Sequence, residues 1–99
     1  NWQSYPVRLD DDIDQLAVMQ SMLDAGVATR RGIMCMHMEA AQADVPLRFP
    51  LPRSEAARDG SILLPLFAQM SEADVAVVRD TLAAALAACR AEIPLRLRA

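Results

Sequence analysis

The sequence contains no lysine, and all ten basic residues among its 99 are arginine. The chain therefore cannot form a Schiff base through a lysine of its own, and it lacks the lysine of a phosphate-binding P-loop. It also has only one histidine and three glycines, with no glycine-rich loop and no pair of carboxylates spaced for acid–base work. We expect no catalytic residue, no cofactor-binding residue and no metal site within these 99 residues.

Positive charge and long apolar runs are scarce as well. Thirteen acidic residues give a net charge of −3, which argues against nucleic-acid binding, because phosphates attract clustered positive charge. No apolar run reaches the ~20 residues that span a bilayer, so we expect no membrane segment. Cys35 and Cys89 are too few for a disulfide framework, and we expect reduced thiols in a cytoplasmic protein.

Hydrophobic residues make up 54% of the chain, enough for one core but not for two. We therefore expect residues 1–99 to form a single domain. The chain starts at Asn1 without an initiator methionine and reads as a piece of a longer protein.

Two short segments have the pattern of strands. Tyr5, Val7 and Leu9 alternate with other residues, and Pro6 places this strand at a sheet edge because proline donates no ladder hydrogen bond. The apolar run 62–67 predicts a second, buried strand with Pro65 at its end or edge.

Three segments predict helices. The first runs from about Asp12 to Ala25, with aspartates 10–12 capping its start and Gly26 its end. Residues 54–60 form one or two turns capped by Ser54, and the last helix begins at Ser71 and stops at Pro94. The apolar positions of the two longer helices are Ile13, Leu16, Ala17, Leu23 and Val27, and then Val75, Val78, Leu82, Ala85, Leu86, Cys89 and Ile93. This order predicts a two-layer α+β domain, with helices on one side of a small, mostly antiparallel sheet.

The sequence does not decide the conformation of residues 30–53. Three methionines alternate with Cys35, His37 and Glu39. An extended chain would place the methionines on one face and the other three side chains on the opposite face, whereas a helical chain would not. The three polar residues do not have a recognised zinc spacing, so His37 is interpreted as a hydrogen-bonded surface histidine. The methionines (Met34, Met36 and Met38) are interpreted as core, and the proline-rich segment 44–53 as an irregular loop.

Five stretches, in order, resemble the C-terminal region of sugar aminotransferases of the DegT/DnrJ/StrS type. They are NWQSYPVRL at 1–9, MLDAGVATRRGI at 22–33, the single His37, LPRSE at 51–55 and LLPLFAQMSEADV at 63–75. The resemblance implies the small domain of an aspartate-aminotransferase-like enzyme that depends on pyridoxal phosphate. Such an enzyme moves an amino group, typically from glutamate, onto a nucleotide-linked keto sugar in amino sugar biosynthesis for surface polysaccharides or glycoconjugates.

In that family the cofactor and its lysine belong to a large domain, which would precede Asn1. The resemblance therefore implies a fragment that is inactive alone, with the missing large domain as its partner and a homodimer as the intact enzyme. It also places His37, Thr29 and either Arg30 or Arg31 near the nucleotide-sugar substrate. The pair Gly32-Ile33 departs from the histidine–aromatic pair of many members.

A second interpretation is a free-standing interaction module whose apolar face meets a partner protein. Both interpretations predict exposed apolar surface, because 54% hydrophobic content is high for so small a domain. A pyridoxal-lysine domain encoded upstream would favour the first, and a start codon near Asn1 would favour the second.

Overall fold

The computed structural model describes residues 3–92, which form a three-stranded antiparallel sheet and three α-helices. The strands are β1 (Tyr5–Arg8), β2 (Arg30–Arg31) and β3 (Ser61–Leu64), in the order β1-β3-β2. In the register, Tyr5 lies opposite Leu64 and Arg30 opposite Leu63. The predicted α+β class is confirmed, and so is the edge position of the strand that carries Pro6. β3 is central and ends at Leu64, just before Pro65.

Helix α1 (Gln15–Asp24) starts three residues later than the sequence predicted. Asp14 is its N-cap and accepts a hydrogen bond from the Ala17 N–H at 3.0 Å. The preceding aspartates have other partners, since Asp11 pairs with Arg8 and Asp10 with Arg90. The predicted apolar face was wrong in part, because Leu16 and Leu23 are exposed. The residues of α1 that are buried are Gln15, Val18 and Met22.

Helix α3 (Glu72–Glu92) begins with the predicted capping box. The Ser71 N–H donates to Asp74 Oδ2 at 2.9 Å, and the Asp74 N–H donates to Ser71 Oγ at 3.2 Å, which satisfies two backbone donors at once. Val78 and Ala85 enter the core as expected, whereas Val75 is exposed. The predicted stop at Pro94 and the Ile93 position lie outside the described residues.

The capping box should make the stability of the chain depend on pH. Hydrogen bonds from the Ser71 hydroxyl and N–H hold the pKa of Asp74 below its ordinary value of 3.8. A carboxyl group whose pKa is depressed by folding stabilises the fold above its unfolded pKa, and that stability is lost as the pH falls through the folded value. Melting temperatures of the native chain and Asp74→Asn should differ most above about pH 4 and converge toward about pH 2. Asp44→Asn, in an exposed loop, is the control, and a difference for Asp74→Asn that is independent of pH would contradict the interpretation.

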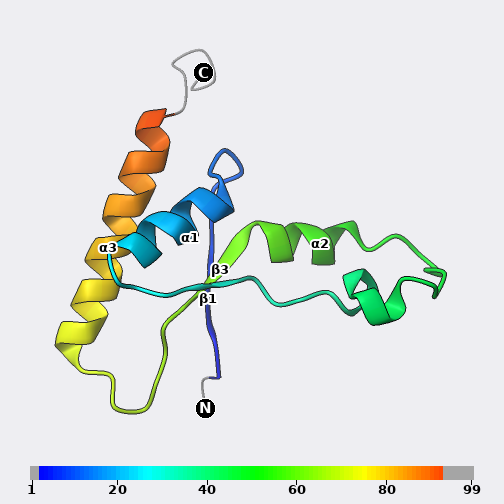
Figure 1. Cartoon of the computed structure of the whole chain (residues 1–99), viewed down its shortest axis with the longest axis horizontal. Helices are drawn as coiled ribbons and strands as arrows, with labels where there is room; N and C mark the ends of the chain where they lie inside the picture. Colours follow the sequence, from blue (N-terminus) through cyan, green and yellow to red (C-terminus); the bar gives the residue numbers. More distant parts are fainter. Residues whose placement is uncertain (1–2, 93–99) are drawn as a thin grey trace.

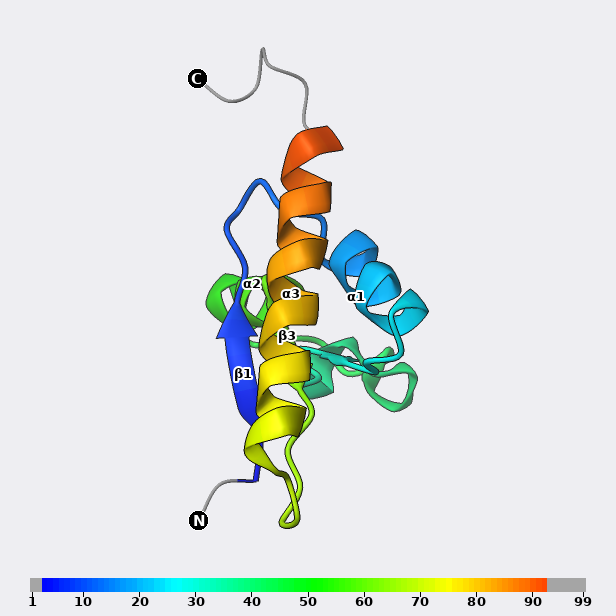
Figure 2. The ribbon, with the colours of Figure 1, turned by 90° about the vertical axis from the view of Figure 1, so that its left-hand side faces the viewer.

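The hydrophobic core lies between the sheet and the two longer helices. Figure 2 shows α3 lying across the sheet with α1 beside it. The buried cluster consists of Leu9, Ile13, Val18, Met22, Val27, Ile62, Val78 and Ala85, and Cys89 lies half-buried against it. Because β3 is central, its Ile62 is completely buried at the middle of this cluster.

Residues 33–59 form an arm that extends sideways from this body (Figure 1). The arm holds two 3₁₀ turns, η1 (Met36–Met38) and η2 (Ala40–Gln42), followed by helix α2 (Pro52–Asp59). α2 starts two residues before the predicted position, because Pro52 occupies its first turn, where a missing N–H costs nothing. Ser54 therefore lies inside the helix and is not its cap. Gly60 ends the helix as predicted, and its N–H donates to Ala56 O at 2.8 Å.

The 3₁₀ turn η1 settles the conformation that the sequence left open. Residues 36–38 are helical, so the methionines do not lie on one side of an extended strand. The prediction that they pack in the core was wrong, since the side chains of Met34 and Met36 are each 73% exposed. The arm therefore has apolar side chains on its surface.

Candidate functional site

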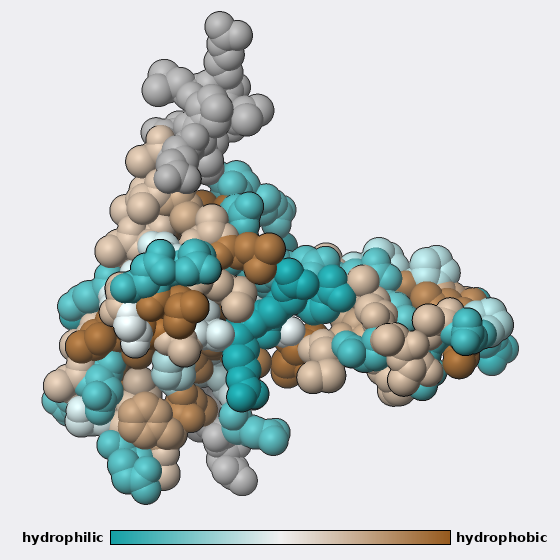
Figure 3. All heavy atoms as spheres, in the orientation of Figure 1, coloured by the Kyte–Doolittle hydropathy of each residue, from teal (hydrophilic) through white to brown (hydrophobic). Residues whose placement is uncertain are grey.

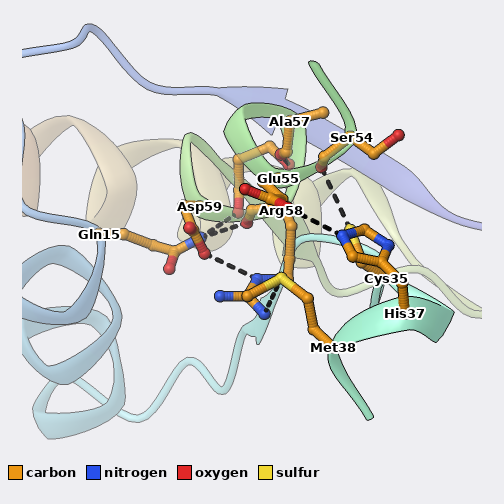
Figure 4. A network of polar contacts seen from close by, with 10 residues as sticks. Gln15, Cys35, His37, Met38, Ser54, Glu55, Ala57, Arg58 and Asp59 are labelled. Atoms are coloured by element: carbon orange, nitrogen blue, oxygen red, sulfur yellow. Dashed lines mark hydrogen bonds and ion pairs between the residues drawn. The ribbon is translucent and has the colours of Figure 1, made fainter. Parts of the chain in front are cut away.

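The candidate site lies where the arm meets the body, around the single histidine. An open hollow of about 540 Å³ is lined there by Cys35, His37 and Arg58, together with Pro6 of β1 and Ser61 of β3. Figure 4 shows the polar side chains of this region, which come from η1, α2 and α1. The hollow thus joins residues of the arm with residues of β1 and β3.

His37 and Cys35 are both held by the first turns of α2. His37 Nε2 lies 2.9 Å from Glu55 Oε1, and the histidine side chain is only 11% exposed. The Cys35 thiol is buried and donates to Ser54 O at 3.3 Å (Figure 4). The hydrogen bond predicted for His37 is confirmed, but the predicted surface position was wrong, because the side chain is largely buried. The second ring nitrogen is not used in this pair. The sequence did not reveal Glu55 as its partner.

Arg58 lies at the other end of α2 and has two side-chain partners. Its Nε donates to Asp59 Oδ1 at 2.7 Å, and one terminal nitrogen donates to Met38 Sδ at 3.0 Å. The hydrogen bond with Asp59 raises the pKa of the Arg58 guanidinium, which is charged at every physiological pH. Arg58 therefore ties η1 to the C-terminal end of α2 and provides a fixed positive charge at the hollow.

Gln15 connects the arm to the body. This buried side chain donates through Nε2 to Ser61 O at 2.6 Å and to Arg58 O at 2.9 Å. It thereby donates to two carbonyls where α2 passes into β3, one of which, Ser61 O, also accepts from the Gly32 N–H. Sequence reasoning missed Gln15, although it lies three and seven residues before Val18 and Met22, the spacing of a shared helix face.

The structure does not gather the sequence-predicted site residues in one place. Arg30 lines a separate hollow of about 350 Å³ beside the end of β3, whereas His37 lines the larger one. Arg31 follows Arg30 on β2 and is also exposed, and successive strand residues point to opposite faces. Thr29 has a buried hydroxyl oxygen without a hydrogen-bond partner in the part of the chain that the structure describes.

A metal ion needs several grouped side chains, and covalently bound pyridoxal phosphate needs a lysine. Within residues 3–92, no three histidine, cysteine or acidic side chains are grouped so that they could hold a metal ion. No helix in the same range is both long and apolar enough to cross a membrane. Because the sequence has no lysine, the residues present do not fit covalent attachment of pyridoxal phosphate through a side chain.

Comparisons with known proteins define the class of fold. No protein-family model matches the chain, and no curated protein matches it. Among solved structures, the chain is similar to the aminotransferase TlmJ from Streptoalloteichus hindustanus, with 30% identity over 86% of this chain and a TM-score of 0.72. It is also similar in fold to a putative sugar aminotransferase from Streptococcus pneumoniae in its PMP form, with 19% identity over 87% of this chain and a TM-score of 0.77.

The fold is therefore that of the small domain of aminotransferase-like enzymes. The chain spans only 22% of the length of each of these two proteins. Its similarity is to part of an aminotransferase and, in fold, to part of a putative sugar aminotransferase, which agrees with the resemblance carried by the sequence.

Proposed function

We propose that residues 1–99 form the C-terminal small domain of a DegT/DnrJ/StrS-type aminotransferase that acts on nucleotide-linked keto sugars. The observation that supports it best is the 30% identity and TM-score of 0.72 to an aminotransferase over 86% of this chain. The reaction would supply amino sugars for surface polysaccharides or glycoconjugates. The proposal includes a homodimeric intact enzyme in the cytoplasm, where reduced thiols such as that of Cys35 persist.

In this proposal the cofactor chemistry belongs to a large domain of the same polypeptide. Pyridoxal phosphate acts as an electron sink when it is bound there. The lack of lysine agrees with a cofactor site in the large domain, because the fragment has no side chain that could hold the cofactor as a Schiff base. The small domain would contribute substrate contacts and would be inactive alone.

The proposed substrate contacts are His37, Thr29, Arg30 and Arg31. The exposed guanidinium group of either Arg30 or Arg31 can bind a nucleotide phosphate with two parallel hydrogen bonds. The Thr29 hydroxyl oxygen is buried without a hydrogen-bond partner among the described residues, and the second ring nitrogen of His37 is not used in the pair with Glu55. Because Arg30 and His37 line different hollows, they would contact different parts of an extended nucleotide sugar.

The test uses the polypeptide encoded by the complete reading frame. It should convert members of a panel of nucleoside-diphosphate keto sugars with glutamate as donor, whereas the 99-residue chain should give no side-chain adduct with pyridoxal phosphate after borohydride reduction. In the intact enzyme, Arg30→Ala or Arg31→Ala should raise the KM for the sugar nucleotide about tenfold, the effect of losing one charged hydrogen bond. Arg79→Ala is the control, because Arg79 pairs with Asp80 on the surface of α3.

Two results would contradict these assignments separately. A side-chain adduct on the 99-residue chain would refute the assignment of cofactor binding to the large domain alone. An unchanged KM in both arginine variants would refute the phosphate contact and leave the enzyme class intact.

A free-standing interaction module is the second candidate. The observation that favours it is the number of large apolar side chains that the body exposes, among them Leu16, Leu23 and Phe67. A coding sequence that starts near Asn1, with no pyridoxal-lysine domain upstream, would support this candidate over the first.

A further inference from the structure

The ring of His37 has one hydrogen-bond partner among the described residues, the carboxylate of Glu55. His37 Nε2 lies 2.9 Å from Glu55 Oε1. Glu55 lies in the first turn of α2, where the positive end of the helix dipole favours a negative charge. An ionised carboxylate can only accept hydrogen bonds, so Nε2 must be the donor. The proton of the neutral ring therefore lies on Nε2.

The second ring nitrogen, Nδ1, is left as an acceptor. In a neutral imidazole one nitrogen donates and the other accepts. Within residues 3–92 no side chain or backbone group donates to Nδ1, and Figure 4 shows the contact with Glu55 on one ring nitrogen only. Nδ1 also reaches solvent, because Thr29 Oγ1 is the fully buried side-chain atom without a partner in that range. Since His37 lines the open hollow of about 540 Å³, it offers a ligand there a hydrogen-bond acceptor.

Two further contacts with α2 hold the backbone on both sides of His37. Before it, the Cys35 thiol donates to Ser54 O at 3.3 Å. After it, Met38 Sδ accepts from a terminal nitrogen of Arg58 at 3.0 Å. The place of η1 against α2 thus depends on contacts other than the one with Glu55. Loss of the Glu55 carboxylate should therefore change the proton on the ring more than the position of the ring.

The rest of the hollow supplies a donor and apolar walls. The Arg58 guanidinium can only donate, and 19% of its side chain is exposed. Hydrophobic and hydrophilic side chains lie side by side along the arm in Figure 3. The apolar residues of the lining include Ile33, Met34, Met36 and Leu51. A ligand that matches both polar groups must present a donor to His37 and an acceptor to Arg58, as neighbouring hydroxyl groups of a sugar ring do.

We propose that Glu55 is a positioning residue that holds His37 in the tautomer whose Nδ1 accepts a hydrogen bond from a hydroxyl group of the substrate. The substrate part rests on the proposed function, because a nucleotide sugar brings that hydroxyl group, whereas the tautomer concerns this chain alone. Glu55 acts through His37 and does not touch the substrate. The arrangement selects a hydroxyl group at this place over a phosphate or a carbonyl group, which can only accept and would face the lone pair of Nδ1.

Nitrogen NMR of the isotope-labelled 99-residue chain tests the tautomer, because its single histidine gives one pair of ring signals. The chain is measured without an added histidine tag at about pH 9, above the usual range of imidazole titration. The Nδ1–H form should be below about a tenth of the native chain, since a hydrogen bond to a carboxylate is worth about tenfold or more. Glu55→Gln should raise that form to about half, because an amide can donate to Nε2 as well as accept from it.

Glu39→Gln is the matched control, since it makes the same chemical change at an exposed glutamate next to η1. It should leave the two tautomers as they are in the native chain. A native chain with Nδ1–H as its main form, or equal populations in the native chain and Glu55→Gln, would overturn the proposal.

Kinetics of the intact enzyme test the substrate part. Glu55→Gln should raise the KM for the sugar nucleotide at least about twofold, because only about half of the molecules then have the competent tautomer. The value of kcat should stay unchanged, as for a contact that is equally strong in the ground state and the transition state. In a His37→Phe background, Glu55→Gln should change neither value further, because its effect passes through His37.

Three outcomes separate the parts of this inference. The same rise in KM in the His37→Phe background would show a purely structural role for Glu55 and overturn the proposal. A changed tautomer with an unchanged KM would overturn the hydroxyl contact. An intact enzyme that converts no keto sugar would refute the proposed function and the substrate part together, and the NMR result would still decide the role of Glu55 in fixing the tautomer.

Discussion

Gly32→Ala should lower the free energy of unfolding by about 3 kcal/mol, because the added methyl group has no room. Gly32 is buried beside the end of α2, and a Cβ atom there would lie 2.6 Å from Arg58 O and 3.0 Å from Ala57 O. The chain cannot move away easily, since the Gly32 N–H donates to Ser61 O at 2.8 Å. Nor can the end of α2 shift freely, because the Gln15 side chain donates a hydrogen bond to Arg58 O.

Urea unfolding followed by circular dichroism measures this effect, and Gly26→Ala separates crowding from backbone strain. Gly26 has φ +86°, but a Cβ atom built there would meet nothing within 4 Å. That variant should lose only about 1 kcal/mol, the cost of a left-handed conformation for an L residue. If Gly32→Ala lost no more stability than Gly26→Ala, the interpretation that a methyl group at position 32 is crowded by backbone atoms would be wrong. The larger loss of stability is expected for Gly32→Ala because its Cβ atom would collide with backbone oxygens, whereas the Cβ atom of Gly26→Ala would not.

Met22→Ala should lower the free energy of unfolding by about 2–5 kcal/mol, as truncation of a fully buried side chain does. Met22 has 0% exposure and lies in the core among residues of α1, β3 and α3. Removing its thioether chain leaves a cavity that the surrounding helices can fill only in part. Denaturant unfolding again provides the measurement.

Met34→Ala is the matched control, since it makes the same chemical change at a side chain that is 73% exposed. It should change the stability by no more than about 0.5 kcal/mol when measured on monomeric protein. Comparable losses at the two positions would mean that Met34 is packed against other residues and is not exposed.

Much of the fold could be predicted from local signals. The reciprocal cap formed by Ser71 and Asp74 depends on residues three apart, so its sequence pattern is sufficient to place the start of α3. The edge position of β1 follows from Pro6, because proline lacks the donor that an inner strand requires. In the same way Gly26 and Gly60 mark helix ends through backbone geometry that their own sequence neighbours determine.

The buried face of α1 could not be predicted correctly from its periodicity. This helix has apolar residues on more than one side, with Leu16 and Leu23 exposed and Val18 and Met22 buried. A periodic pattern shows where apolar residues lie around a helix, but it does not show which side meets the sheet. The polar Gln15 is buried because it lies on the side where Arg58 O and Ser61 O can accept hydrogen bonds from its amide.

The residue types of this chain limit the chemistry that it can perform. Without lysine it cannot hold a cofactor as a Schiff base, and its ordered motifs resemble those of sugar aminotransferases. Which residues meet depends on the packed fold, since His37 and Glu55 are 18 positions apart and Gln15 and Ser61 are 46 apart. The physical reason is that residue type and local spacing set what a group can do, whereas contacts between distant residues arise only when packing around the core brings their elements together.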